Sequence, residues 1–204
     1  MIQIDTFVKG FSGRIGQAHG EPWELMQGLN DLLTEMMQNL GDDFLIENQI
    51  AIHKTAVIEA NVTLKAPVII GANCFIGANA YLRNGVFLGN GVKIGTGCEI
   101  KSSVVFDKSS IAHFNFIGDS IIGSSVNFEA GSITANHFNE RRDKDVYVVY
   151  QGNVINTGVH KFGALVGDGS KIGANAVLSP GTLLKRDTVV QRLELIDQLN
   201  QVRS

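Results

Sequence analysis

Small apolar residues recur at every sixth position between residues 56 and 104. Steps of six from Ala56 reach Val62, Val68, Cys74, Ala80, Val86, Val92, Cys98 and Val104. A larger apolar residue follows two positions after each, from Ile58 to Phe106, and glycine often comes next. The pattern resumes from residue 164 to residue 184. A helix would need a period near 3.6, so this period predicts short strands in a repeating solenoid.

The six-residue period resembles that of left-handed parallel β-helices, in which three hexads close one triangular coil. In such a coil the small residue faces the narrow interior and the glycine relieves the corner. We therefore expect a mainly β protein with a left-handed β-helix over residues 49–188. Cys74 and Cys98 fall at inward positions, where we expect small buried hydrophobic side chains rather than a disulfide or metal ligands.

Three segments lack the repeat. Residues 1–48 form an N-terminal segment, in which 21–41 carry an apolar stripe between Pro22 and Gly41 and read as an amphipathic helix. We expect this helix to cap the open end of the solenoid. Residues 137–162 predict an inserted loop with a hairpin, DVYVVY and NVINTG, that turns near residues 151–153. Residues 189–204 read as a C-terminal helix.

Composition narrows the function classes. The 204 residues carry a net charge of −3, which gives no basic footprint for nucleic acid. The N-terminus lacks the apolar run of a secretory signal, and no segment approaches the about 20 apolar residues needed to cross a bilayer. We therefore expect a cytoplasmic protein without a membrane or nucleic-acid partner.

Polar side chains interrupt the repeat in the stretch AHFNFIGDSIIGSSVNFEAGSITAN, residues 112–136, beginning with His113. This stretch resembles the acetyltransferase domain of the bifunctional N-acetylglucosamine-1-phosphate uridylyltransferase/glucosamine-1-phosphate acetyltransferase family. The most similar members are the archaeal sugar-1-phosphate nucleotidylyltransferase/acetyltransferases, which share the His, the Gly-Asp, the Val-Asn-Phe run and the Ala-Asn before an insertion. The likeness extends over about residues 50–185.

The resemblance implies transfer of an acetyl group from acetyl-CoA to the amine of a hexosamine 1-phosphate, with His113 as the general base and no metal. An ammonium must lose a proton before it attacks a thioester, and an imidazole with a near-neutral pKa can take that proton. The alternative is a histidine that only hydrogen-bonds in a corner of the solenoid.

Two cations align with the family's phosphate-binding Arg and Lys. Arg83 and Lys101 are eighteen residues apart, which is one full coil, so both would lie on one face and could share a phosphate. The alternative is a pair of solvated surface charges. The inserted loop adds further cations that are either phosphate contacts or a solvated charged loop, namely Arg141, Arg142, Lys144 and Lys161.

The resemblance assigns the remaining contacts residue by residue. Asn127 would hydrogen-bond the sugar, Asn136 would lie near the reacting amine and thioester, and backbone groups at Ala130 and Ala174 would hold CoA. Both asparagines could instead be structural, either hydrogen-bonded in a ladder along the solenoid or capping a turn. Phe116 stands where the family has a substrate-contacting tyrosine, and loss of such a hydroxyl typically costs about 1–3 kcal/mol.

These observations favour a stand-alone amino-sugar phosphate N-acetyltransferase, because the first 45 residues are too short for a nucleotidylyltransferase domain. Relatives imply a homotrimer with the acyl site between subunits. A second interpretation is a non-catalytic sugar-phosphate or nucleotide-sugar binding protein or scaffold, since Phe116 differs and the hexads end near Leu184, before a coil that helps relatives bind CoA. A zinc hydratase on the same fold is disfavoured, because the five histidines lack the spacing of a three-histidine site.

Overall fold

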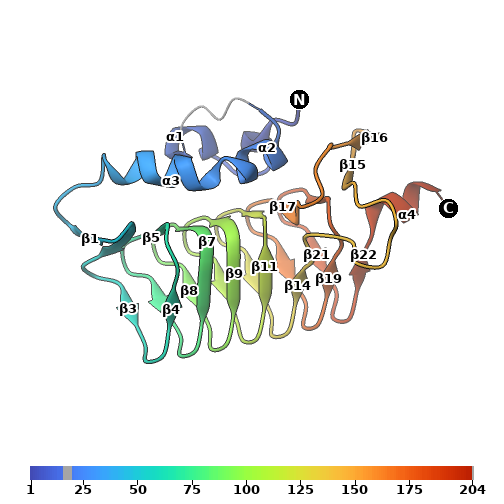
Figure 1. Ribbon diagram of the computed structural model, residues 1–204. Coiled ribbons are helices and arrows are strands. Elements are labelled where there is room, and N and C mark those ends of the chain that lie inside the picture. Colours follow the sequence, from blue (N-terminus) through green and yellow to red (C-terminus); the bar gives the residue numbers. More distant parts are fainter. Residues whose placement is uncertain (16–19, 204) are drawn as a thin grey trace.

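The chain forms a parallel β-helix whose coils stack along one axis, with helices along one side (Figure 1). This computed structural model describes residues 1–15 and 20–203. Each coil contributes short strands to three faces, and each strand pairs in parallel with its counterpart in the next coil. The predicted β-helix of hexapeptide repeats is confirmed.

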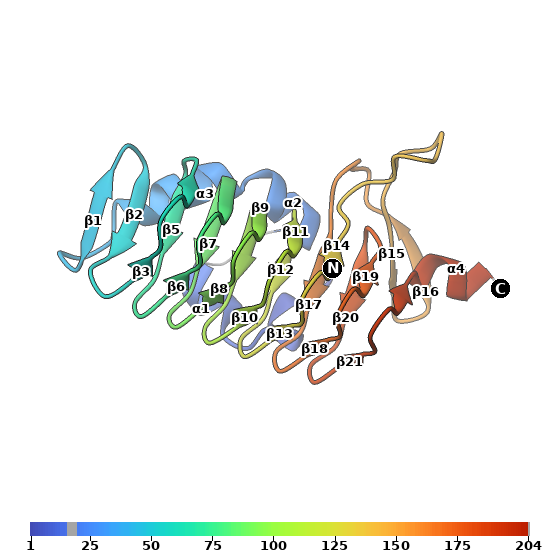
Figure 2. The same cartoon turned by 90° about the horizontal axis from the view of Figure 1, so that it is seen from below.

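The three faces differ in what lies outside them. The helix face contains β2 (Ile50–His53), β5 (Val68–Ile70), β12 (Ile121–Ile122), β17 (Ala164–Val166), β20 (Thr182–Leu184) and the C-terminal halves of β7 (Tyr81–Leu88) and β9 (Glu99–Val105). The second face contains β3 (Val57–Ile58), β6 (Phe75–Ile76), β8 (Lys93–Ile94), β10 (Ser110–Ile111), β13 (Asn127–Phe128), β18 (Lys171–Ile172) and β21 (Val189–Val190). The third face contains β4 (Thr63–Leu64), β11 (Phe116–Gly118), β14 (Ile133–Thr134), β19 (Val177–Leu178), β22 (Leu195–Ile196) and the N-terminal halves of β7 and β9. Figure 2 shows the coils stacked in chain order.

The interior is lined by the small and large apolar residues of the hexads, as predicted. Cys74 and Cys98 are each 1% exposed and carry free thiols. Burial raises the pKa of both thiols, and each donates a hydrogen bond to a backbone carbonyl of the chain. The expectation of small buried hydrophobic side chains is confirmed.

The six-residue register slips by one residue at Ser103 and again at Ser120, so the predicted inward positions of Val104 and Phe106 are wrong. Strand β7 pairs Arg83 with Lys101, but Val86 then pairs with Ser103, because the corner of the next coil is one residue shorter. Ser103 and Val105 therefore face the interior, and the two predicted residues lie in the outer apolar layer. The Ser103 hydroxyl donates to the Lys101 carbonyl and accepts from the Ser120 N–H, which satisfies it inside the solenoid.

The helices cover the helix face, not the open end as predicted. The outward residues of that face form one apolar ladder, all at most 5% exposed: Ala51, Ile69, Phe87, Val104, Ile121, Leu165 and Leu183. A 3-10 turn η1 (Ile4–Thr6) and the helices α1 (Phe11–Ile15), α2 (Pro22–Gln27) and α3 (Leu29–Met37) lie over it (Figure 1). The side of the prism offers far more apolar area than its end, and burial of that area stabilises the layer.

The remaining elements follow the predictions in part. The expected helix over 21–41 is two helices that meet at Gly28. The predicted hairpin is confirmed, with β15 (Tyr147–Tyr150) antiparallel to β16 (Asn153–Asn156). The predicted helix from residue 189 is wrong over its first half, because β21 and β22 continue the solenoid and α4 begins only at Gln198 (Gln198–Arg203). At the other end, β1 (Phe44–Glu47) closes the sheet by antiparallel pairing with β2.

Leu33→Ala should lower the free energy of unfolding by about 2–5 kcal/mol, because this fully buried side chain would leave a cavity between α3 and the sheet. Leu45→Ala is the matched control, since Leu45 is 73% exposed on β1 and should change stability by less than about 0.5 kcal/mol. Urea unfolding at one fixed protein concentration measures both. Equal effects from the two substitutions would contradict the packing of the helix layer.

Candidate functional site

Strand register brings the two predicted cations together at one end of the third face. Arg83 on β7 is the direct neighbour of Lys101 on β9, and Lys101 in turn pairs with Gly118 on β11. The three residues occupy successive coils at the corner between the third face and the helix face. The one-coil separation predicted from the sequence is therefore present.

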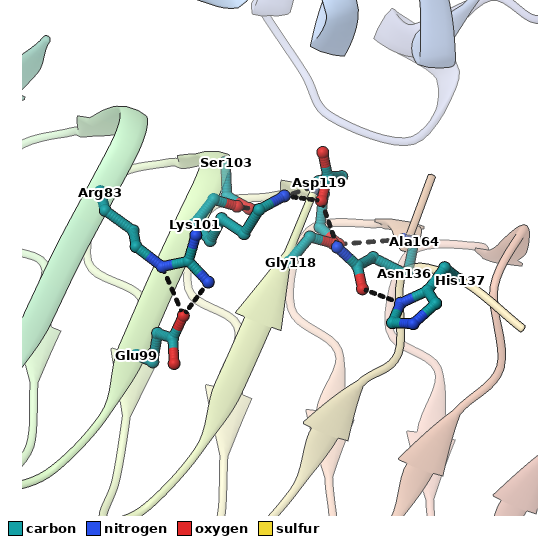
Figure 3. Close-up of polar contacts among 10 residues, drawn as sticks. Arg83, Glu99, Lys101, Ser103, Gly118, Asp119, Asn136, His137 and Ala164 are labelled. Carbon is teal, nitrogen blue, oxygen red and sulfur yellow. Dashed lines mark hydrogen bonds and ion pairs between the residues drawn. The ribbon is translucent and has the colours of Figure 1, made fainter. Parts of the chain in front are cut away.

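Each cation already has a carboxylate partner (Figure 3). Glu99 Oε1 accepts from Arg83, at 2.7 Å from Nε and 2.6 Å from Nη2. Asp119 Oδ2 lies 2.6 Å from Lys101 Nζ, and both side chains are nearly buried, at 12% and 10% exposed. Neither carboxylate was assigned a role from the sequence. A phosphate at this corner must therefore compete with two internal partners.

The Lys101 pair continues into a short polar network. Asp119 Oδ2 also accepts from the Asn136 amide, and Asn136 Oδ1 lies 3.1 Å from Nδ1 of His137 (Figure 3). Asn136 is 5% exposed and ends the coil that precedes the inserted loop. The structure thus joins the predicted Asn136 to Lys101 through Asp119, the acid of the Gly-Asp in the motif.

Phe116 lies close to this network on the third face. A Cβ at Gly118 would lie 2.7 Å from the Phe116 ring and 3.0 Å from Asn136, so a side chain at Gly118 would displace the ring that crosses the strand here. On the outer side of the sheet, Phe116 lies between Glu99 and Ile133. A ligand on this face would therefore rest on an aromatic ring that has no hydroxyl.

His113 lies at the other corner of the same face, three residues before β11. Its side chain is exposed, and its imidazole has no hydrogen-bond partner among residues 1–15 and 20–203. A Cβ at Gly95 would lie 3.1 Å from Nδ1 of His113 and only 1.8 Å from the carbonyl oxygen of Ala112, so the ring sits directly against the preceding coil. The position is fixed by backbone stacking while the ring remains accessible.

The predicted CoA residues stack on the His113 corner. The Gly131 N–H donates to the His113 carbonyl at 2.9 Å, and the Asn175 N–H donates to the Ala130 carbonyl at 3.0 Å. His113, Ala130 and Ala174 therefore occupy successive coils of one corner. The structure brings this second group together but leaves it at the opposite end of β11 from Lys101, five residues or at most about 17 Å of extended chain away.

A groove of about 450 Å³ runs beside this corner on the second face. Asn127 lines it, together with Glu129, Lys171 and Arg192. Glu129 Oε2 accepts from the Ala174 N–H at 2.9 Å, and Arg192 donates to both Glu129 oxygens at 2.9 and 3.0 Å. Arg192, and then this backbone N–H, lower the pKa of Glu129 to about 2. The Ala174 N–H expected to face CoA is thus already taken by the Glu129 carboxylate.

Three family models match parts of the chain. The bacterial transferase hexapeptide (six repeats) matches residues 50–84, the GMPPB C-terminal domain matches residues 76–138, and the hexapeptide repeat of succinyl-transferase matches residues 155–190. Together with the stacked coils, these matches decide the class. The chain is a hexapeptide-repeat protein.

Curated relatives of this hexapeptide-repeat protein are named bifunctional proteins. The bifunctional protein GlmU of Methanococcus maripaludis is 36% identical over 184 residues, which are 88% of this chain and 44% of that protein. The bifunctional sugar-1-phosphate nucleotidylyltransferase/acetyltransferase of Sulfurisphaera tokodaii is 35% identical over 186 residues, 82% of this chain and 46% of that protein. The predicted resemblance is confirmed, and the chain spans less than half the length of these relatives.

A solved structure of a perosamine N-acetyltransferase mutant from Caulobacter crescentus, in complex with CoA and GDP-perosamine, is also similar. It matches 84% of this chain and 71% of its own, at 16% identity and a TM-score of 0.31. That level of similarity carries no argument about the ligands of the hexapeptide-repeat protein.

Two cations of the inserted loop have structural partners. The Arg141 guanidinium lies 3.5 Å from the centre of the Phe138 ring and pairs with Asp197 at 3.5 Å. Lys144 donates to the carbonyls of Phe138 and Asn139. These contacts tie the loop of the hexapeptide-repeat protein to itself and to the C-terminal segment, so neither cation is simply solvated.

Among residues 1–15 and 20–203, no group of three histidine, cysteine or acidic residues could hold a metal ion. His19, one of the five histidines considered for zinc, lies outside the described residues. In the same part of the chain, every helix is too short or too polar to span a membrane.

Asp119→Asn should lower the free energy of unfolding of the hexapeptide-repeat protein by about 3–5 kcal/mol, because it leaves the nearly buried Lys101 ammonium without a carboxylate. Asparagine also tolerates the left-handed backbone at this position, where φ is 45°. Glu99→Gln is the matched control and should change stability by less than about 1 kcal/mol, since the Arg83 pair is more exposed. Urea unfolding compares them, and a larger effect at Glu99 would refute this ranking.

Proposed function

We propose that this protein is an N-acetyltransferase that moves an acetyl group from acetyl-CoA to the amine of an amino-sugar phosphate. The observation that carries the proposal is the stacking of His113, Ala130 and Ala174 on successive coils of one corner. The similarity to the relative named a sugar-1-phosphate nucleotidylyltransferase/acetyltransferase extends over 82% of the chain. By the same similarity, residues 49–188 are the catalytic body and residues 137–162 an accessory loop.

His113 acts as the general base. Its imidazole removes a proton from the ammonium of the acceptor, and the amine then attacks the carbonyl carbon of the thioester. The new C–N bond forms first and gives a tetrahedral intermediate; its collapse breaks the C–S bond, and the second proton lost by the nitrogen goes to the departing thiolate of CoA. Backbone N–H groups near Ala130 stabilise the oxyanion of the tetrahedral intermediate. Asn127 binds the sugar, and Asn136 lies near the reacting amine.

The acceptor lies on the third face, over Phe116, with its phosphate toward Arg83 and Lys101. Because these cations and His113 lie at opposite ends of β11 in one chain, the His113 that meets the amine belongs to a neighbouring subunit of the proposed trimer. Arg83 is the more available cation, because its partner Glu99 is one-third exposed and can exchange places with a phosphate at small cost. Lys101 is nearly buried in its ion pair with Asp119. It is therefore better suited to stabilise the corner of the solenoid than to leave Asp119 for a phosphate. We also propose a cytoplasmic location, in keeping with the compartment of acetyl-CoA and sugar phosphates.

His113→Ala should reduce acetyl transfer by at least a hundredfold, because general-base catalysis typically contributes about 10²–10⁴ to the rate. The assay mixes the protein with acetyl-CoA and glucosamine 1-phosphate and follows release of free thiol. His137→Ala is the control, and it should retain most of the activity because, within the described residues, the His137 imidazole hydrogen-bonds to Asn136 alone. Full activity of the His113 variant would remove it as the base.

A second candidate is a non-catalytic sugar-phosphate or nucleotide-sugar binding protein. Three observations favour it: both cations are paired, the Ala174 N–H is taken by Glu129, and Phe116 lacks the tyrosine hydroxyl. Calorimetry separates the two functions. Binding of glucosamine 1-phosphate without any affinity for CoA would favour the non-catalytic protein.

A homotrimer completes the proposal. The third face has an outward apolar ladder over its last coils, namely Phe116, Ile133, Val177 and Leu195, of which Ile133 is 39% and Leu195 is 61% exposed. No helix of the described chain covers this ladder, in contrast to the helix face (Figure 1). An exposed apolar patch of this kind marks an interaction surface.

Ile133→Glu combined with Leu195→Glu should convert the trimer to monomer, because two carboxylates would be buried in the interface. Sedimentation velocity measures the mass. Val154→Glu is the control, since Val154 is 44% exposed on the hairpin and away from the third face. A monomeric wild-type protein would contradict both the trimer and a site shared between subunits.

A further inference from the structure

Strand register places Arg192 in the same column of corner residues as His113. The column takes the residue three positions after each paired strand residue of the second face, and it includes His113, Ala130, Ala174 and Arg192. Arg192 therefore stands three coils beyond His113, which is about 14 Å at the usual spacing of neighbouring strands. The groove of about 450 Å³ on the second face runs beside this end of the column.

One carboxylate ties down two groups at that end. Glu129 Oε2 accepts from the Ala174 N–H and from Arg192 Nε, each at 2.9 Å, and Oε1 accepts from Arg192 Nη2 at 3.0 Å. Gly173 holds the position of Glu129 in the next coil, so the pair crosses a coil that has no side chain there. Both side chains line the groove. A backbone donor and a guanidinium beside the groove thus share a single internal acceptor.

A second glutamate shows which part of this arrangement is structural. Glu59 holds the same position four coils earlier, and its Oε2 accepts from the Ala78 N–H at 2.7 Å. Glu59 forms no ion pair with any described residue. A glutamate at this position therefore caps the next coil without the help of an arginine. Capping explains the contact of Glu129 with Ala174 and leaves the bidentate pair with Arg192 unexplained.

The pair is placed where an anion can open it. The side chains of Arg192 and Glu129 are 73% and 38% exposed, and an ion pair so exposed to water contributes little stability and opens readily. A guanidinium binds phosphate with the same two-donor geometry as carboxylate. Lys171 lines the same groove and forms no ion pair within the described residues, so it adds attraction for an anion. CoA carries its phosphates at the far end of the pantetheine arm from its sulfur.

We propose that the Glu129–Arg192 pair is an autoinhibitory latch on the CoA side of the site. With the latch closed, the carboxylate occupies both the Ala174 N–H and Arg192. When CoA binds, one of its phosphates takes Arg192, Glu129 turns to solvent, and the Ala174 N–H becomes available to the pantetheine arm. The latch lowers the apparent affinity for CoA by the fraction of molecules in which it is open. This inference rests on the proposed function, because it takes CoA as the ligand of the His113 corner.

Calorimetry of the full chain with CoA tests the latch through the signs of two effects. Glu129→Ala removes the competing acceptor and should tighten CoA binding by about threefold to tenfold. Glu129→Gln still caps Ala174 but lacks the charge, and it should tighten binding by a smaller factor. Arg192→Ala should weaken binding by about tenfold or more, because a charge-assisted contact with phosphate is lost. A pair that only held the corner together would give weaker binding in all three variants.

Glu59→Ala is the matched control, since it removes the equivalent cap at Ala78, where no arginine takes part, and it should leave the affinity unchanged. Thermal unfolding checks that each variant folds. Unchanged or weaker binding in both Glu129 variants, tighter binding in Arg192→Ala, or an equal gain in Glu59→Ala would overturn the latch.

The latch and the proposed function fail in different ways. Weaker CoA binding in the Glu129 variants of a protein that transfers acetyl groups would refute the latch alone. The opposite signs at Glu129 and Arg192 in a protein without acetyl transfer would refute the proposed function alone. No binding of millimolar CoA by the wild-type protein and by both Glu129 variants would overturn the latch and the assignment of CoA to this corner together.

Discussion

Close stacking of backbone at the corners of the solenoid is the constraint on which the rest of the structure depends. At Gly77 an added Cβ would lie 2.8 Å from the backbone of the next coil, and at Gly95 only 1.8 Å from it. Neighbouring coils can therefore approach to strand spacing only if these corners carry no side chain. The same contact at Gly95 sets the imidazole of His113 against the coil beneath it. A glycine at position 95 is therefore needed both for the stacking of the coils and for the placement of the candidate base.

The three faces of the prism show how one repeat supports different surfaces. On the helix face the outward apolar ladder is buried under α1–α3, and that layer also forms a wall of a cavity that Asp119 lines. On the third face a similar ladder from Phe116 to Leu195 remains partly exposed. The N-terminal segment thus packs as part of the same folded body as the solenoid. Because it covers only the helix face, the third face remains available for association between subunits and for a ligand.

The six-residue period was sufficient to predict the β-helix and its inward cysteines, because each hexad repeats the same steric demand. It could not locate the slips at Ser103 and Ser120; at the first, Val104 and Phe106 are apolar and suit either side of the sheet. The strands at Val189 and Leu195 were missed because their coil lacks the usual glycines. The linear motif found His113, Lys101 and Asn136. It did not predict the ion pairs of Glu99, Asp119, Glu129 and Arg192, because a partner one or more coils away is near in space and distant in sequence.

These missed partners decide how the site can work. A cation that is nearly buried with its own carboxylate has already exchanged water for a fixed partner, so a phosphate gains little by approaching Lys101 alone. The more exposed Arg83 pair can open at much lower cost. Lys161 has no ion-pair partner among the described residues and lines a cavity together with Asp119. The sequence predicted that Arg83 and Lys101 bind phosphate together. The ion pairs divide this role differently: Lys101 stabilises the corner of the solenoid through its pair with Asp119, whereas Arg83 and Lys161 remain able to bind an anion.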